Sequence, residues 1–226
     1  MISNLLQVDT QSIFLQESTS ISIIDLAIKG GWLMIPLLLL SIIALYIIGE
    51  RWHTLRVASK QDQHFMDNIR DFITDGKLTS AQHFCRTQTS PVARIVEKGI
   101  EQIDRPIADI NISLENIGNL EIARLEKSLP MLAAIAGGAP MVGFLGTVVG
   151  MVQAFFNMAE AGNNVDITLL SGGIYTALVT TVAGLIVGIT AYFGYNYLTA
   201  RVGTIMHMME RNIIDFLEMI REIRKK

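Results

Sequence analysis

Four threonines lie near the middle of long apolar stretches, where few other side chains could do chemistry: Thr147, Thr176, Thr180 and Thr181. A single threonine in a membrane helix says little, because its hydroxyl can bond the carbonyl one turn back. Four threonines on faces that could converge predict a polar lining. If several subunits pack around an axis, these hydroxyls would form rings that line an ion pathway.

Ionisable side chains are absent from the same stretches. No Asp, Glu, Lys, Arg or His occurs in residues 30–49, 128–159 or 167–200. Intramembrane ionisable residues normally mark proton relays and ion pathways, and a hydroxyl cannot carry a proton by titrating near neutral pH. If this protein conducts protons, the titrating group must therefore come from another chain. Alone, this chain could supply at most the hydrogen-bonding wall of such a pathway.

The three charge-free runs are the elements that must position the threonines. They are 20, 32 and 34 residues long, and apolar stretches beyond about 18 residues are typical of transmembrane helices. The composition agrees, with 17% charged residues and a mean hydropathy of +0.41. We expect an all-α membrane protein with spans over residues 28–49, 128–159 and 167–200.

The positive charges indicate the topology. Residues 1–29 hold one Lys or Arg and residues 160–166 none, whereas residues 50–127 hold eleven and residues 201–226 six. Cytoplasmic segments carry the Lys/Arg excess. We therefore expect segment 1–27 and the 160–166 loop outside the cytoplasm, a cytoplasmic helical domain over 50–127, and a cytoplasmic C-terminal helix over 201–226. The N-terminus is then outside and the C-terminus inside.

Local signals predict helices in these cytoplasmic segments as well. Gly76 is typical of a helix stop, and Ser90 followed by Pro91 is typical of an N-cap with proline in the first turn. Pro130 is the only interruption between the apolar seam that starts at Ile107 and the second span. At 1.5 Å per residue, the second and third runs reach about 50 Å against a hydrocarbon core of about 30 Å. Both should continue beyond the bilayer as helices.

Small residues recur at helical spacing along the second and third spans. Small side chains let helix backbones approach closely inside lipid, so these residues form either helix-packing seams or the wall of a pore. The residues concerned are Pro140, Gly143, Gly146, Gly150, Gly184 and Gly188.

Several classes of function are excluded. A net charge of −3 provides no field for nucleic acid. The single cysteine, Cys85, excludes an internal disulfide and a multi-cysteine metal site. No nucleophile–base pair, phosphate-binding loop or metal-ligand spacing is present. We therefore expect neither an enzyme nor a bound cofactor or metal.

Two motifs carry a specific resemblance to a known family. Residues 139–151 read A-P-M-V-G-F-L-G-T-V-V-G-M, and residues 173–185 read G-I-Y-T-A-L-V-T-T-V-A-G-L. With the Gly-Glu-Arg at 49–51, they resemble the ExbB/TolQ/MotA family of proton-channel stator proteins, and the ExbB-like branch in particular. The resemblance covers roughly residues 120–200.

The resemblance implies a cyclic homo-oligomer, a pentamer, in the bacterial inner membrane. Its second and third spans would line a central pore around two single-span partner helices of the ExbD/TolR type. The partner would supply a membrane aspartate, and Thr147 and Thr181 are the pore threonines expected to face it. Proton flow would drive mechanical work, which in the ExbB branch energises outer-membrane transport through a TonB-like protein.

One position departs from the family pattern. Many relatives place a glutamate in a Gly-Ile-x-Glu-Ala-Leu sequence, where this chain has Thr176. Either Thr176 supplies a neutral hydrogen-bonding ring, or an acidic residue near the pore mouth has a similar role. Candidates for such a cytoplasmic exit are Glu115, Glu121 and Glu126. They could equally form a solvated face or ion pairs with Arg124 and Lys127.

Other functions stay open within the same architecture. The chain could be a TolQ-like subunit for envelope integrity, a gliding-type stator, or a passive oligomeric scaffold in the lipid bilayer that only holds a partner. MotA proper has four spans, which argues against that branch. The ion is also open, because hydroxyl and carbonyl oxygens suit sodium as well.

Overall fold

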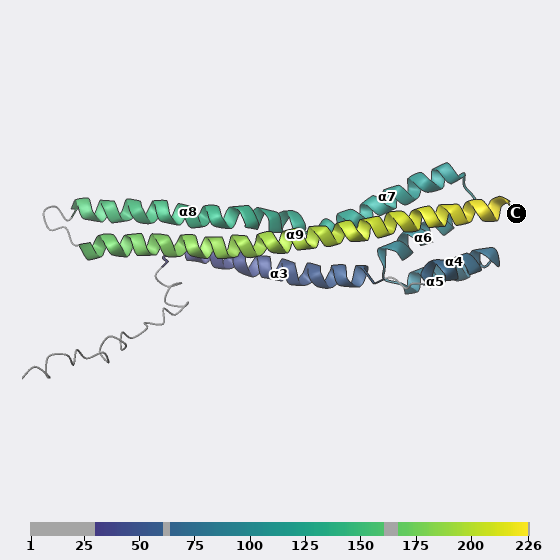
Figure 1. Cartoon of the computed structure of the whole chain (residues 1–226), viewed down its shortest axis with the longest axis horizontal. Helices are drawn as coiled ribbons and strands as arrows, with labels where there is room; N and C mark the ends of the chain where they lie inside the picture. The colour runs from purple at the N-terminus through teal and green to yellow at the C-terminus, as the bar shows by residue number, and fades with distance from the viewer. Residues whose placement is uncertain (1–29, 61–63, 161–166, 226) are drawn as a thin grey trace, which may run out of the picture.

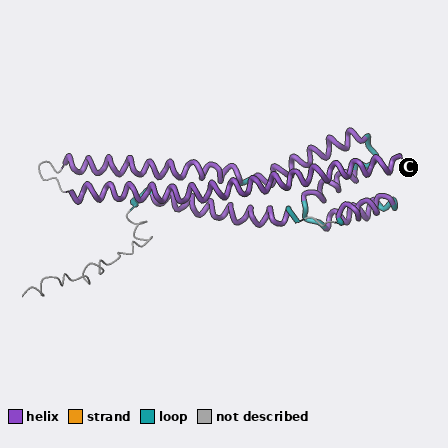
Figure 2. The backbone as a smooth tube through the Cα atoms, viewed as in Figure 1, coloured by secondary structure: helices purple, strands orange, loops and turns teal. Residues whose placement is uncertain are grey.

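The computed structural model describes residues 30–60, 64–160 and 167–225, and within them it is helical with no strand (Figure 2). The predicted all-α fold is confirmed. The helices are α3 (Met34–Ala58), α4 (Phe65–Thr74), α5 (Leu78–Thr87), α6 (Pro91–Glu101), α7 (Ile107–Glu126), α8 (Leu129–Glu160) and α9 (Ile167–Lys225). The predicted segment 1–27 lies outside the described residues, as do residues 161–166 of the predicted loop.

The helices form a long rod with two parts (Figure 1). In one part, α8 and α9 lie antiparallel and make the most extensive helix–helix contact of the described chain, with α3 packed mainly against α9. In the other part, α4, α6 and α7 pack against the C-terminal half of α9, and α5 packs on α4 and α6. The same helix, α9, therefore runs through both parts.

Three helices or helix runs are long and apolar enough to cross a membrane: Met34–Ala58, Ile107–Glu160 and Leu170–Lys225. This confirms the three predicted spans, and the chain is a membrane protein. The first helix differs from its predicted span, because it begins at Met34 after a turn in which Gly31 has a φ of 70°. It continues to Ala58, since a helix does not have to end where its apolar run ends.

The third span and the C-terminal helix are one element. Helix α9 has 59 residues, which is about 88 Å at 1.5 Å per residue. No proline interrupts it, and beyond residue 200 its apolar face is buried against the other helices through Met209, Phe216 and Ile220. The boundary predicted between 200 and 201 is therefore a change of surroundings and not a break in the helix.

The predicted end of α4 and the predicted start of α6 are confirmed. The Ser90 hydroxyl accepts a hydrogen bond from the Ala93 amide at 3.2 Å, and Pro91 is the first residue of α6. Gly76 has a φ of 73° and ends the α4 segment. The Lys77 amide donates to the Phe72 carbonyl at 2.9 Å, the hydrogen bond that defines a Schellman end, and this end requires the left-handed backbone that glycine adopts readily.

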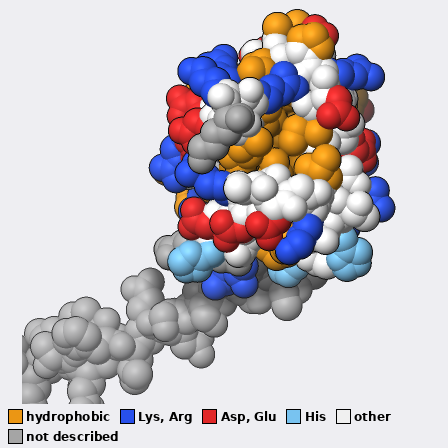
Figure 3. All heavy atoms as spheres, turned by 90° about the vertical axis from the view of Figure 1, so that its right-hand side faces the viewer, with side chains coloured by type: hydrophobic (Ala, Val, Ile, Leu, Met, Phe, Trp, Pro, Cys, Tyr) orange, Lys and Arg blue, Asp and Glu red, His pale blue; other side chains and the backbone are white. Residues whose placement is uncertain are grey.

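A continuous apolar core holds α4–α7 and the C-terminal half of α9 together. Phe65 and Ile69 of α4, Ile95 of α6, Leu114 of α7 and Phe216 of α9 are each at most 1% exposed. Seen from the end that carries the C-terminus, apolar side chains gather in the centre and charged side chains surround them (Figure 3). This is the arrangement of a water-soluble helix bundle that is joined to the membrane helices.

Candidate functional site

The contact between α8 and α9 depends on glycine at several positions along the two helices. A Cβ atom at Gly184 would lie 2.6 Å from the Ala139 carbonyl oxygen and 2.9 Å from the Gly143 Cα. One at Gly150 would lie 2.9 Å from the Ala177 Cβ. Real Cβ atoms do not approach other atoms this closely, so the two backbones touch where these glycines stand, as packing inside lipid favours.

Pro140 and Gly188 continue this contact. Proline has no amide hydrogen, so the Ala136 carbonyl one turn earlier loses its usual helical donor. A Cβ at Gly188 would meet the Pro140 ring and would lie 3.1 Å from the Ala136 oxygen. All six predicted small-residue positions thus lie between α8 and α9 of one chain. The sequence left packing and pore wall open, and in the protomer these residues pack.

Thr180 belongs to the packing contact. It is 1% exposed, and its hydroxyl donates to the Ala177 carbonyl at 2.7 Å. A Cβ at Gly146 would overlap the Thr180 side chain, so the absence of a side chain on α8 makes room for this threonine. Its side chain faces the neighbouring helix. In the protomer Thr180 is therefore a packing residue and not the exposed lining residue that the sequence predicts.

Thr147 and Thr181 bond neighbouring backbone carbonyls of α8. The Thr181 hydroxyl donates across to the Gly143 carbonyl on α8 at 2.9 Å, and the Thr147 hydroxyl donates to the Phe144 carbonyl at 2.6 Å. The Gly143 carbonyl is also the acceptor one turn before the Thr147 amide. Both threonines are half-buried, so part of each remains at the surface of the α8–α9 pair.

Thr176 lies apart from the other threonines. It is half-buried, and its methyl carbon is 3.9 Å from the position that a Cβ would take at Gly31, just before α3. It therefore faces the beginning of the first span. The four threonines differ in their contacts. The Thr147 and Thr180 hydroxyls bond their own helices, the Thr181 hydroxyl bonds α8, and Thr176 lies near the start of the first span.

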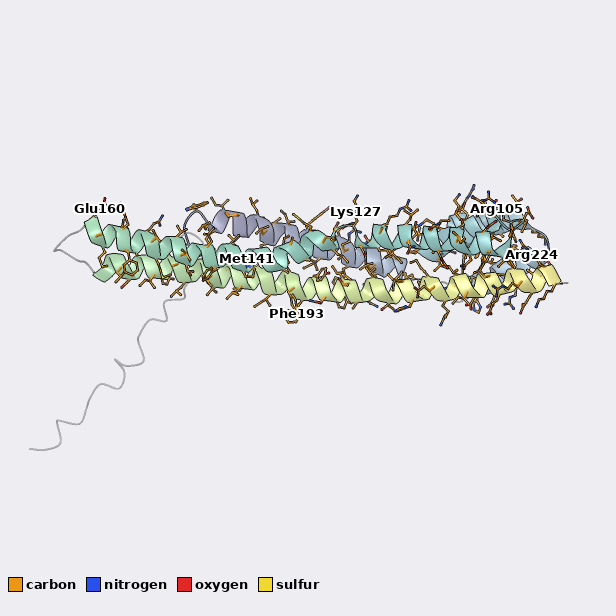
Figure 4. The ribbon with its side chains drawn as sticks, turned by 90° about the horizontal axis from the view of Figure 1, so that it is seen from above. Arg105, Lys127, Met141, Glu160, Phe193 and Arg224 are labelled. Atoms are coloured by element: carbon orange, nitrogen blue, oxygen red, sulfur yellow. The ribbon has the colours of Figure 1, made fainter. Side chains whose placement is uncertain are left out.

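Large apolar side chains cover the outside of the membrane helices. Met141 on α8 is 73% exposed and Phe193 on α9 is 68% exposed, and both point away from the helix pair (Figure 4). Phe144, next to the threonine site, is 66% exposed. These surfaces suit lipid or other membrane helices, since no water-exposed protein surface is this apolar over such a length.

Glu121, predicted as an exit candidate, is a buried ion-pair residue. Its side chain is 3% exposed, and it pairs with Arg94 of α6 and with Arg124, whose Nη1 lies 2.5 Å from its Oε1. Of the alternatives given for Glu121, the protomer contains the ion pair with Arg124. Arg94, and not Lys127, is the second partner, so the carboxylate joins α6 to α7.

The other two exit candidates are exposed on α7. Glu115 accepts a hydrogen bond from the Asn111 side-chain amide at 2.7 Å. It also lines a groove of about 470 Å³ between α7 and α9, with Glu210 on the opposite side. Glu126 lies at the last residue of α7. The three predicted carboxylates thus have separate surroundings in the protomer.

Cys85 and the remaining acidic or histidine side chains add no chemistry to the site. Burial, with a smaller contribution from nearby Glu97, raises the pKa of the Cys85 thiol to about 12, so it stays protonated and unreactive near neutral pH. Across residues 30–60, 64–160 and 167–225, no three His, Cys, Asp or Glu side chains are close enough to hold a metal ion.

Sequence reasoning missed the role of Arg51. The sequence predicts only a positive charge that follows the first span. In the structure, the Arg51 side chain is 9% exposed and reaches two carbonyls at the end of α7. The one available signal was the Glu50–Arg51 pair directly after an apolar run. This signal is not specific, because charged residues commonly follow a membrane-spanning helix.

Fold and site together define a membrane protein with a glycine-packed helix pair and a half-buried pair of hydroxyls. Residues 87–211 match the family described as the MotA/TolQ/ExbB proton channel family. The match includes α6, α7, α8 and most of α9, and so contains the whole threonine site. The chain belongs to this family.

Curated relatives carry both ExbB and TolQ names. The chain is 30% identical to "Putative biopolymer transport protein ExbB-like 1" of Synechocystis sp., over 79% of this chain and 71% of that protein. It is 28% identical to the Tol-Pal system protein TolQ of Haemophilus influenzae, over 83% and 89%. It is 27% identical to the biopolymer transport protein ExbB of Neisseria meningitidis serogroup A, over 72% and 78%.

Proposed function

We propose that this chain is the pore-forming stator subunit of a proton-driven motor in the bacterial inner membrane. In this role it couples ion flow to mechanical work on a separate single-span protein. One observation carries the proposal: the Thr181 hydroxyl donates to the Gly143 carbonyl and the Thr147 hydroxyl to the neighbouring Phe144 carbonyl, within stretches 128–159 and 167–200 that contain no Asp, Glu, Lys, Arg or His. A hydrogen-bonding site without its own acid fits a partner that brings one.

The hydrogen bonds of the two threonines indicate which form of that acid they would hold. Both hydroxyls already donate to carbonyls, at 2.9 Å and 2.6 Å, so what each oxygen has left to offer is its acceptor lone pairs. A protonated carboxyl can donate to them, whereas a carboxylate cannot. Apolar surroundings also favour the neutral acid. The site would therefore stabilise the protonated partner, which would release its proton on reaching water.

The assembly follows from the family and from the exposed faces. We propose a cyclic homo-oligomer, a pentamer, with the N-terminus outside and the C-terminus in the cytoplasm. An ExbD/TolR-type partner with a membrane aspartate would sit at its centre. The apolar outer surface at Met141, Phe144 and Phe193 supports burial against lipid and against neighbouring subunits. The charge distribution of the segments supports the orientation.

Within the family we propose the ExbB-like branch, which energises outer-membrane transport through a TonB-like protein. The ExbB-like name of the 30% identical relative supports this branch. The TolQ names among the other relatives keep a TolQ-like role in envelope integrity as the alternative. Complementation separates the two: an ExbB-like chain restores TonB-dependent uptake to a strain lacking its own subunit, whereas a TolQ-like chain restores detergent resistance.

The test of the threonine site is replacement by valine, which keeps the branched shape and removes the hydroxyl. Thr147→Val and Thr181→Val should each lower gradient-dependent work about tenfold, because a hydrogen bond to the neutral acid is lost. Thr190→Val is the matched control, since Thr190 on α9 is exposed and bonds only its own helix at 2.8 Å to Ile186. The readout is work per assembled complex, with assembly measured on the same membranes.

Full activity of both Thr147→Val and Thr181→Val at normal assembly would contradict the stator proposal. A second function, a passive scaffold, is favoured by the packing role of Thr180 and the six small residues. A scaffold predicts that collapsing the proton gradient with an uncoupler leaves the motion of the partner's extracytoplasmic part unchanged. A stator predicts that this motion stops.

A further inference from the structure

Arg51 is a buried cation that crosses from one helix to the end of another. It lies in α3, and its Nη1 donates to the carbonyl of Arg124 at 3.1 Å and approaches that of Leu125 at 3.5 Å. Its Nε is buried, pairs with the Glu50 carboxylate at 2.9 Å and makes no hydrogen bond. A guanidinium is kept in such a place only when it satisfies other groups.

The groups that Arg51 reaches belong to a break in the backbone. Helix α7 ends at Glu126 and α8 begins at Leu129, and Figure 4 marks Lys127 between them. The last carbonyls of a helix have no donor within it. Here Pro130 deepens the deficit, because it has no amide hydrogen to offer to the Glu126 carbonyl. The α7–α8 connection therefore lacks donors at the point where a side chain from α3 supplies them.

We propose that Arg51 is a positioning residue that closes the α7–α8 break and fixes the direction in which α7 leaves α8. Two routes join the membrane helices to the cytoplasmic bundle. One is the continuous helix α9, and the other is the interrupted α7–α8 run. With Arg51 in place the second route is a stiff joint, so that both parts of the rod move together. The inference concerns the joint itself and does not depend on the proposed stator function.

The test is hydrogen exchange of the full chain in lipid nanodiscs, without any gradient. Arg51→Gln should speed exchange of the amides between 127 and 132 by about fivefold to tenfold, since the donors that satisfy the break are lost. Arg51→Lys should act in the same direction, because an ammonium is a point donor and lacks the planar fork. Arg56→Gln is the matched control: it removes the same charge from an exposed position in α3.

A second substitution separates a role at the break from general destabilisation. Pro130→Ala restores an amide that can donate to the Glu126 carbonyl. The α7 helix can then continue into α8, so that the Ser128 and Leu129 amides take the place of Arg51 at the Arg124 and Leu125 carbonyls. In the double variant with Arg51→Gln, exchange between 127 and 132 should return towards the native rate. Native exchange in folded Arg51→Gln protein would overturn the proposal, and so would faster exchange that Pro130→Ala does not reduce.

Failure to fold is also informative in this design. If neither Arg51 variant inserts into the membrane while Arg56→Gln does, recovery of folding by Pro130→Ala supports the joint. No recovery overturns it. Because exchange is measured without a partner or a proton gradient, a failure of the stator proposal leaves this result unaffected, and the reverse also holds.

Discussion

At the scale of single residues, the membrane part depends on where side chains are missing. Gly184 and Gly143 bring the α8 and α9 backbones into contact, with 2.9 Å between the Gly143 Cα and the place a Gly184 Cβ would take. Thr180 fits against Gly146, and Thr181 reaches Gly143 because nothing stands between them. The hydroxyl geometry of the candidate site is thus a consequence of glycine packing.

Gly184→Ala should therefore separate the two helices. The added methyl would lie 2.6 Å from the Ala139 carbonyl oxygen, and overpacking of this kind costs about 1–3 kcal/mol. Gly172→Ala is the control on the same helix, since nothing lies within 4 Å of its Cβ position and alanine favours a helix by ~1 kcal/mol. Thermal unfolding of the purified protein measures both. Equal midpoints for the two variants would contradict the packing role.

At the scale of helices, some helix ends are set by hydrogen bonds of adjacent residues, and others are set by packing against the rest of the chain. α6 begins at Pro91 because the Ser90 hydroxyl accepts the Ala93 amide at 3.2 Å. Ser90→Ala should lower the free energy of unfolding by about 1 kcal/mol. Ser80→Ala, at an exposed position of α5, should change it by less than about 0.5 kcal/mol. Urea titration of the protein in detergent micelles provides the measurement, and equal effects would argue against the cap.

This distinction explains how much of the fold could be predicted from the sequence. The Ser90 and Gly76 signals act through the adjacent backbone, so they predicted ends that the structure contains. Apolar runs predicted three spans, because length and hydrophobicity are enough to cross a bilayer. They could not predict that α9 continues to Lys225, since helix continuity across the membrane surface is decided by packing against α4–α7.

The site was less accessible to sequence reasoning for a related reason. Periodicity places Thr176, Thr180 and Thr181 on neighbouring turns, but which of them faces α8 depends on how the two helices are rotated. Thr180 became buried and Thr181 bonded across the interface. The contact from Arg51 to Arg124 spans 73 residues, and no local pattern in a single sequence indicates a pairing at that separation.

At the scale of the whole molecule, the chain joins apolar membrane helices to a charged helix bundle formed by α4–α7 and the C-terminal half of α9. Residues 128–159 and 167–200 contain no Asp, Glu, Lys, Arg or His, while Glu121 and its arginines lie beyond them in α6 and α7. Helix α9 and the α7–α8 run connect the two parts. In the proposed stator, the group that carries the proton would therefore come from a partner chain.

This leads to a prediction for the reconstituted protein. In vesicles that enclose a pH-sensitive dye, the chain alone should give a proton flux no higher than empty vesicles, because its hydroxyls cannot exchange protons by titration. Adding a single-span partner with a membrane aspartate should raise the flux, and the Asp→Asn partner should not. The asparagine partner controls for assembly, since it keeps the size of the side chain. A chain that conducts protons without any partner would contradict the idea that the acid arrives on another helix.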